Sequence, residues 1–206
     1  MKKTLRRNIE LGVLFGLVCS VMISFARFDA HCEELREGVL RLHIIANSDS
    51  EEDQALKLKV RDRILEISAD KLGVAYNIDE AIRIINNDID LLIENANEVI
   101  QNEGYDYAVS VNTEKNFFEN RVYDEFTLPA GVYNSLTIRI GEAKGHNWWC
   151  VVFPGVCLPA AQKKELKGAV SAGSAGVAQN ANKYKIRFKS VEIYEKIKNK
   201  VQKNKK

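Results

Sequence analysis

The sequence lacks the spaced residue sets that mark common catalytic and cofactor sites. It contains no glycine-rich phosphate loop, no HExxH or CxxC metal spacing, and no G-x-S-x-G nucleophile turn. It has only three histidines, at positions 31, 43 and 146, and no two of them are close in sequence. These absences argue against a phosphate-loop enzyme, a zinc enzyme with a contiguous motif and a serine hydrolase. The sequence therefore predicts no catalytic set, no metal, no cofactor and no small-molecule substrate.

A basic surface for nucleic acid is also missing from the body of the chain. The first 27 residues carry a net charge of +4 and residues 183–206 one of +8, so, within a total of +2, residues 28–182 carry −10. Binding to nucleic acid needs a basic face that releases counterions from the phosphates. The central domain is therefore not expected to bind nucleic acid.

The first 29 residues have the pattern of an export segment. The basic stretch "MKKTLRR" precedes an apolar run from Leu11 to Phe25. Ser24 and Ala26 are small residues at the two positions that a signal peptidase inspects, but residues 9–28 are also nearly long enough to span a bilayer. Residues 1–29 are thus a cleaved signal peptide or an N-terminal membrane anchor, and in both cases residues 30–206 are expected outside the membrane.

Four cysteines are present, and export changes their interpretation. Cys19 lies inside the apolar run, whereas Cys150 and Cys157 flank the turn signal Pro154-Gly155. A disulfide between these two is plausible in an oxidising compartment. The alternative is a pair of reduced, packed thiols, and the role of Cys32 is open.

Apolar periodicity predicts one strand and two helices in the first half of the domain. Residues 39–46 alternate, with His43 on the face opposite the apolar one. The next apolar positions recur at helical spacing, and a second stripe runs from Ile78 to a stop at Gly104. The first of these two helices carries its stripe at Leu56, Val60, Ile64 and Ile67.

From Asp106 the apolar period becomes two, which indicates strands. Runs around 107–111, 122–128, 132–140 and 148–153 are separated by turn residues, and the last run lacks polar alternation. The predicted fold class is α+β: a two-layer sandwich of a mainly antiparallel sheet, with two helices between the first strand and a C-terminal meander. This domain is expected to cover residues 30–160.

The C-terminal fifth of the chain is expected to lie outside that domain. Residues 161–182 include a run of small and polar residues without a sustained period, which indicates a flexible linker. Residues 183–206 form a lysine-rich tail with a weak helical stripe at Val191, Tyr194, Ile197 and Val201. The tail is either held on an anionic lipid or wall polymer, or solvated.

The stretch "ANSDSEED" at 46–53 invites two interpretations. Ser48 and Ser50 each stand three residues before an acidic residue, which is the spacing of a capping box at a helix start. Acidic groups also suit the first turn of a helix, where the dipole favours negative charge. A helix cap therefore explains Asp49 and Asp53 without a metal or substrate. The alternative is a reactive site built on the same carboxylates.

Two further groups of side chains deserve a functional hypothesis. Cys150 and His146 could form a cysteine–histidine pair, but their spacing across a turn does not orient a base towards the thiol. Trp148 and Trp149 point to opposite sides of a strand, so one of them faces a partner or is covered by another part of the chain. We therefore choose Trp148, Trp149, Phe153 and Pro154 as candidate partner contacts.

Two blocks of the sequence resemble a known family. "LRLHIIANSDSEEDQALKLKVRD" at 40–62 and "PAGVYNSLTIRIGEAKGHNWWCVVFPGVC" at 129–157 are similar to the signature blocks of the stage II sporulation protein R family. The sequence departs from that pattern at Gly155-Val156, where the family more often has proline and leucine. The positions in these blocks that carry the resemblance include Asn47, Ser48, Asp49, Asp53, Arg61, Asp62, Gly131, Asn147, Cys150 and Cys157.

The resemblance implies a function that composition does not reach. Members of the family are made in the forespore, are exported into the space between forespore and mother cell, and activate a membrane-embedded aspartic protease. That protease cuts the precursor of a mother-cell sigma factor. The chain is then a signalling protein and not an enzyme, and its partner is the extracytoplasmic part of the protease. The alternatives are a cell-wall-acting enzyme and a structural protein of the intermembrane space.

Overall fold

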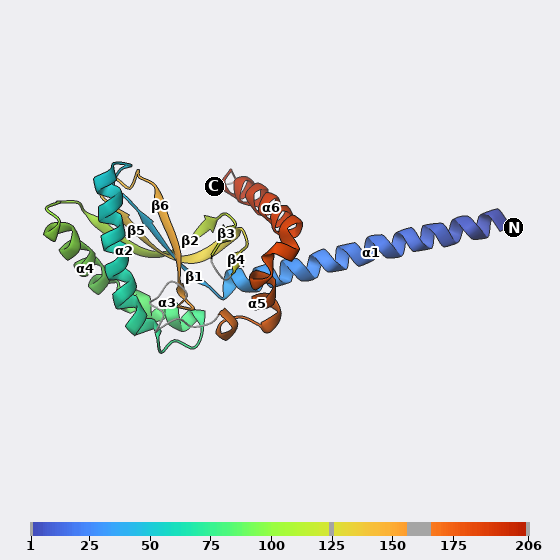
Figure 1. Cartoon of the computed structure of the whole chain (residues 1–206), viewed down its shortest axis with the longest axis horizontal. Coiled ribbons are helices and arrows are strands. Elements are labelled where there is room, and N and C mark those ends of the chain that lie inside the picture. Colours follow the sequence, from blue (N-terminus) through green and yellow to red (C-terminus); the bar gives the residue numbers. More distant parts are fainter. Residues whose placement is uncertain (1, 124–125, 156–165, 205–206) are drawn as a thin grey trace.

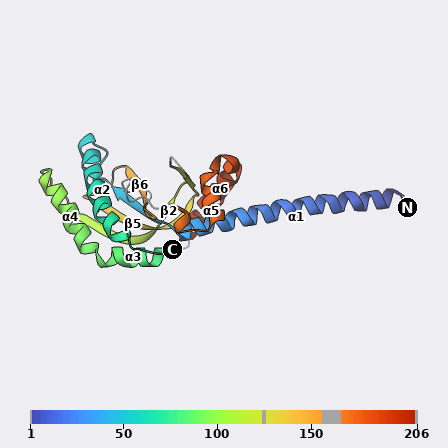
Figure 2. The ribbon, with the colours of Figure 1, turned by 60° about the horizontal axis from the view of Figure 1, so that its bottom comes forward.

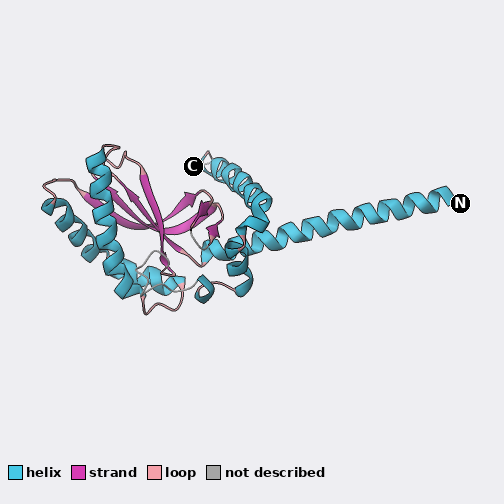
Figure 3. Ribbon diagram, viewed as in Figure 1, coloured by secondary structure: helices cyan, strands magenta, loops and turns pink. Residues whose placement is uncertain are grey.

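The structure is a computed structural model that describes residues 2–123, 126–155 and 166–204. Its centre is a mainly antiparallel four-stranded sheet with helices around it, so the predicted α+β class is confirmed (Figure 3). In chain order, the first elements are α1 (Lys2–Glu37), β1 (Leu40–Ile45), α2 (Glu51–Leu72), α3 (Ile78–Asn87), α4 (Ile89–Asn102) and β2 (Val109–Phe118). They are followed by β3 (Arg121–Val122), β4 (Thr127–Leu128), β5 (Gly131–Ile140), β6 (Asn147–Phe153), η2 (Leu166–Gly168), α5 (Ala172–Gln179), η3 (Ala181–Tyr184) and α6 (Lys185–Lys203).

The sheet has the strand order β2-β5-β1-β6, which differs from the predicted meander. β1 is inserted between β5 and β6, parallel to the first and antiparallel to the second. The segment joining β5 to β6 crosses the end of β1, where the N–H groups of Lys144 and Gly145 donate to the carbonyls of Asn47 and Ala46. β6 is therefore an edge strand of this sheet and β1 a central one.

Helices α2, α3 and α4 cover one face of the sheet (Figures 1 and 2). The apolar face of β1 packs against the stripe of α2, as the alternation and the helical period predict. The single helix predicted over 78–104 is two helices, because Asp88 leaves the helical conformation and its N–H bonds to the carbonyls of Ile84 and Ile85. The apolar stripe continues across this break, and periodicity alone therefore does not reveal it.

The C-terminal segment packs against the domain, where the sequence predicts a linker and a tail. Ser171 caps α5, accepting a hydrogen bond from the N–H of Ser174, and the small residues of α5 let it lie close to α1. Over 172–182, where the sequence predicts part of a flexible linker, the structure has α5 and the start of η3. Residues 161–165 of that predicted linker lie outside the described part. In α6, Phe188 and Val191 are buried against α1, whereas Tyr194, Ile197 and Val201 of the predicted stripe are exposed.

The first helix is longer than the predicted export segment. α1 continues without a break past residue 29, and Phe28, Cys32 and Leu35 near its end belong to the core. Figure 1 shows its N-terminal part projecting away from the rest of the molecule. Within Thr4–Glu37 it is apolar and long enough to cross a membrane, and its apolar window is not buried by the protein. The helix thus joins an apolar segment, long enough to cross a membrane, to a part of the folded domain.

Candidate functional site

The stretch around Asn47–Asp53 forms the start of α2 and joins it to the end of β1. Ser50 is the N-cap: its backbone is extended and its Oγ accepts a hydrogen bond from the N–H of Asp53 at 3.1 Å. Three acidic residues occupy the first turn of α2, where the helix dipole favours them. The predicted cap is confirmed, at Ser50 and not at Ser48.

Asp53 is the centre of this junction. Its Oδ2 accepts hydrogen bonds from Ser48 Oγ at 2.6 Å and Asn47 Nδ2 at 2.9 Å, and the side chain of Tyr107 also bonds to it. Burial raises the pKa of Asp53, but these hydrogen bonds to the carboxylate outweigh burial, and the net pKa lies below its usual value. The carboxylate is therefore held ionised by its donors.

The same junction holds the segment between β5 and β6. Asn47 Oδ1 accepts from the N–H of Glu142 at 2.9 Å, and Asp49 Oδ1 accepts from the N–H of His146 at 2.6 Å. The Nδ1 of His146 lies 2.5 Å from that same Asp49 oxygen. Gly141 has φ +57°, and a side chain there would overlap Asn47. The two blocks singled out by the sequence thus meet in space and bond to each other.

A buried lysine reinforces this contact. Lys57, nearly two turns into α2, donates from Nζ to the carbonyl of His146 at 2.9 Å and to Gln54 Oε1 at 2.5 Å. Burial lowers the pKa of Lys57, although Asp49 acts in the opposite direction. The ammonium ties α2 to the start of β6, a contact that a helical pattern does not predict because it joins residues 89 positions apart.

The two tryptophans of β6 are both half-buried and face different clusters. Trp148 packs with the helical face, and the guanidinium of Arg61 lies 4.5 Å from its ring centroid. Trp149 lies edge-on to His43 and Phe118, with ring centroids 5.9 Å and 5.5 Å away. Neither indole N–H has a hydrogen-bond partner within the described structure. The opposite orientations are as predicted, and Trp149 packs against a cluster that holds residues of the sheet together with residues of η2 and α5.

The other candidate contacts are less accessible. Phe153 and Pro154 are buried, so neither presents a surface to a partner in this structure. Cys150 is disulfide-bonded. Cys157 lies outside the described residues, and the pairing of Cys150 with Cys157 stays a prediction.

Three further family-motif positions, Asp62, Asn147 and Gly131, contact nearby side chains. Asp62 accepts a hydrogen bond from Arg61 Nε at 2.7 Å on α2, and Asn147 Oδ1 lies 2.9 Å from Nε2 of His43. Burial lowers the pKa of His43, which favours the neutral ring. Gly131, at φ +151°, lies against the side chain of Arg36, and a Cβ there would overlap it. Asn147 and Gly131 thus contact other elements, Asp62 contacts its neighbour on the same helix, and the described family-motif positions do not converge on one pocket.

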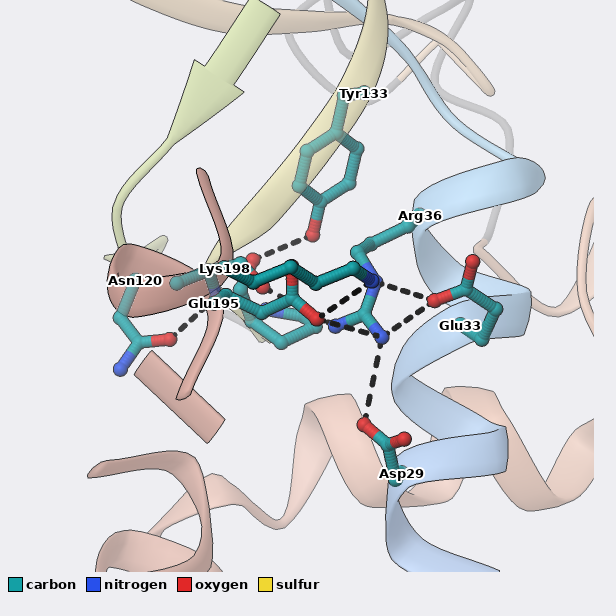
Figure 4. A network of polar contacts seen from close by, with 9 residues as sticks. Asp29, Glu33, Arg36, Asn120, Tyr133, Glu195 and Lys198 are labelled. Carbon is teal, nitrogen blue, oxygen red and sulfur yellow. Dashed lines mark hydrogen bonds and ion pairs between the residues drawn. The ribbon is translucent and has the colours of Figure 1, made fainter. Parts of the chain in front are cut away.

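Sequence reasoning missed a polar network at the other end of the molecule (Figure 4). Arg36, nearly buried at the end of α1, donates to Glu33 and to the carbonyl of Ala130, and Glu195 of α6 lies 3.9 Å from it. Asn120 donates to Glu192 of the same helix at 2.8 Å. Apart from Arg36 and Glu33, these partners are 72 to 159 positions apart in the chain, and no local pattern signals such contacts.

A second missed residue is Arg41, which is fully buried in β1. Its guanidinium lies 4.0 Å from the centroid of Phe118 and 5.0 Å from that of Tyr133, and it donates to Tyr123 Oη at 2.9 Å. Burial lowers the pKa of Arg41. Strand alternation does place Arg41 on the face of the sheet opposite to Leu40 and Leu42. It does not indicate the aromatic side chains around Arg41, which stabilise a buried cation.

The geometry does not assemble the cysteine–histidine pair considered above. His146 is directed to Asp49, and Cys150 is disulfide-bonded, so the two are not arranged as base and nucleophile. Within residues 2–123, 126–155 and 166–204, no group of three or more His, Cys, Asp or Glu side chains is placed to hold a metal ion. The site is best described as a hydrogen-bonded junction with an adjacent tryptophan surface.

Comparison with known proteins places these blocks in a family. The family model for "Stage II sporulation protein R" matches residues 36–163, which include the junction and all six strands. A curated relative, Stage II sporulation protein R of Bacillus subtilis (strain 168), is 32% identical over 163 residues, covering 76% of this chain and 71% of that protein. No solved structure matches the chain.

Proposed function

Because the chain belongs to the stage II sporulation protein R family, we propose that it is an exported sporulation signal that activates a membrane-embedded aspartic protease. The activated protease then processes the precursor of a mother-cell sigma factor. The signal acts as a binding partner of the protease and has no catalytic role of its own.

One observation carries this proposal: the two sequence blocks of the family form a single, internally bonded surface. Asn47 and Asp49 of the first block bind the backbone of Glu142 and His146 in the second. Their polar groups are engaged with each other, which leaves a preorganised outer surface suited to recognition. A rigid binding surface agrees better with a signalling ligand than with a wall-cleaving enzyme.

Helix α1 determines on which side of the membrane the domain meets its partner. Four basic residues precede its apolar part, which favours an orientation with the folded domain on the outer side of the membrane. This orientation brings the domain to the extracytoplasmic part of a membrane-embedded protease. The membrane segment itself, when retained, keeps the signal in the plane where the protease lies.

Trp148 is the proposed centre of the contact surface. It is half-buried on the edge strand β6, stacked with Arg61 and close in sequence to the exposed His146. Tryptophan and arginine are enriched among residues that carry binding energy. Phe153 and Pro154 are left out of this surface because they are buried.

Co-purification of the full chain with the protease from co-expressing membranes tests the proposal. The native chain should be retained by the tagged protease, and Trp148→Leu should reduce that retention by at least about tenfold, the scale of one interface hot spot. Tyr76→Leu is the matched control, because Tyr76 is an exposed aromatic residue on the loop joining α2 to α3. No retention of the native chain, or equal loss in both variants, would contradict the proposed contact.

A further inference from the structure

A pocket of about 900 Å³ lies where α1 meets the C-terminal helices. Residues of α1 from Gly16 to His31 form one wall, and residues of α5, η3 and α6 from Ala172 to Arg187 form the other. Figures 1 and 2 both show α5 and α6 beside the point where α1 leaves the domain. The pocket is separate from the junction at Asn47–Asp53 and from the tryptophans of β6.

The charged side chains that line this pocket are all basic. Arg27, Lys183 and Arg187 are lining residues, and no aspartate or glutamate is among them. Within the described chain none of these three cations has a carboxylate oxygen within 4.0 Å, whereas Lys189, Lys196 and Lys198 of α6 do. The pocket therefore has a positive potential that the protein does not neutralise.

Arg187 is held in place without being neutralised. Its Nη2 donates to Ser24 Oγ at 2.9 Å, and its guanidinium carbon lies within 6 Å of the ring centroids of Phe25, Phe28 and Tyr184. Cation–π contacts and one neutral hydrogen bond fix its position and leave other donors available. A guanidinium presented in this way suits a phosphate group.

The position of the pocket along α1 points to the source of that phosphate. The wall from Gly16 to Ile23 belongs to the apolar, protein-free part of α1, whereas Phe28 and Cys32, a few residues later, are buried in the domain. If α1 spans a bilayer, the pocket lies at its surface, with an apolar end towards the acyl chains and a basic end at the headgroups.

We infer that this pocket binds the headgroup of an anionic phospholipid, with Arg27, Lys183 and Arg187 contacting the phosphate and the apolar wall of α1 contacting an acyl chain. The inference does not depend on the proposed activation of a protease. It requires that α1 is retained, since cleavage after Ala26 would remove the wall from Gly16 to Ser24.

Native mass spectrometry of the detergent-solubilised full chain tests the inference, with phosphatidylglycerol and phosphatidylcholine as probes. The native chain should retain phosphatidylglycerol in preference to phosphatidylcholine. Each basic residue near a membrane surface contributes about fivefold in affinity, so Arg27→Gln should weaken phosphatidylglycerol binding about fivefold and the triple change to glutamine about a hundredfold.

A charge-matched control separates a site from general attraction. Lys115→Gln/Lys200→Gln/Lys203→Gln removes the same charge at exposed positions outside the pocket and should leave binding unchanged. Free glycerol phosphate should not compete, because it lacks the acyl chains. Arg27 is exposed and its side chain has no hydrogen bond within the described chain, so Arg27→Gln keeps the test open should the triple variant misfold.

The outcomes divide cleanly. Selective retention that the pocket variants lose and the control keeps would support the site. Equal binding of the two lipids, equal loss in the control, or full competition by glycerol phosphate would overturn it. N-terminal sequencing of protein from producing cells that begins after Ala26 would also overturn it.

Discussion

At the scale of single residues, the acidic and polar side chains of 46–53 act on one another. Asp53 collects hydrogen bonds from Asn47 and Ser48, and Asp49 bonds to the backbone of His146. Hydrogen bonds to an ionised carboxylate are among the stronger ones in proteins. A cluster of carboxylates that could be taken from the sequence for a catalytic centre thus joins the start of α2 to the segment between β5 and β6. We call this set of contacts the clasp.

Replacing Asp53 should weaken this clasp in a pH-dependent way. The pKa of Asp53 is lowered in the folded protein, so its stabilisation is complete above the unfolded value of about 3.9 and is lost as pH falls through the folded value. At pH 7, Asp53→Asn should lower the free energy of unfolding by about 1–3 kcal/mol. Urea unfolding at pH 7 and pH 3 measures the difference.

The same measurement contains its control. The native chain should lose more stability between pH 7 and pH 3 than Asp53→Asn does, because the variant has no carboxylate at position 53 to protonate. Asp90→Asn, at an exposed position of α4 where the side chain has no hydrogen bond or ion pair within the described residues, should behave like the native chain. An unchanged pH dependence in Asp53→Asn would refute the role of Asp53.

A cap at Ser50 makes a separate prediction. Ser50→Ala removes the oxygen that accepts the N–H of Asp53 and should cost about 0.5–2 kcal/mol of stability. Signalling should decline only as far as the folded fraction declines. Thermal unfolding and a signalling assay on the same preparations measure both. If Asp49→Asn abolished signalling in a folded, exported protein, the junction would be a working site.

At the scale of elements, the sequence patterns predicted the features that depend on neighbouring residues, namely strands, amphipathic helices and a helix cap. The alternation of β1, the stripe and cap of α2 and the strands of the second half follow from period and turn chemistry. The break at Asp88 and the insertion of β1 between β5 and β6 depend on contacts between distant segments. In α5, small residues without a period allow close packing on α1, and the same composition is typical of linkers.

For the candidate site, too, the sequence predicted the local features but not the contacts between distant segments. A cap at the start of α2 and opposite faces for Trp148 and Trp149 follow from spacing alone. Contacts such as Asp49 with His146, or Arg36 with Ala130, join residues about a hundred positions apart and have no local signal. The burial of Phe153 and Pro154 likewise depends on elements that the sequence does not place.

The two tryptophans of β6 should differ when replaced. Trp149→Ala removes a ring that contacts His43 and Phe118 and should lower the free energy of unfolding by about 2–4 kcal/mol. Trp148→Leu keeps an apolar side chain against the helices and should cost less than about 1.5 kcal/mol while reducing signalling. If the two variants lost equal stability, and signalling fell only as far as stability in both, neither tryptophan would be a partner contact and β6 would be part of the core alone.

Helix α6 should protect the end of α1. Cys32 is fully buried in the cluster that Phe188 and Val191 complete. A chain ending at residue 184 should therefore expose the Cys32 thiol and raise its labelling rate by at least about tenfold, since access controls thiol reactivity. Both chains carry Cys19→Ser, so that the label does not report on Cys19. Unchanged labelling in a shortened chain that remains folded would show that α6 does not cover Cys32.

At the scale of the whole molecule, charge and shape are arranged along α1. Residues 28–182 are acidic, whereas basic residues lie before the apolar part of α1 and in the C-terminal segment beside its exit from the domain. This distribution agrees with a domain held at a membrane surface and directed away from it. The described parts of the two family blocks include β1, the first half of α2, β5 and β6, and they lie at a distance from the projecting end of α1 (Figure 1).

The central claim is activation of a protease across a membrane, and reconstitution tests it most directly. Vesicles containing the membrane-embedded aspartic protease and, in their lumen, the sigma-factor precursor are mixed with the purified full chain added outside. The account predicts precursor cleavage only when the chain is present on the side opposite the precursor, and loss of cleavage with Trp148→Leu but not with Tyr76→Leu. Cleavage that is unaffected by the chain, or that requires the chain on the same side as the precursor, would contradict it.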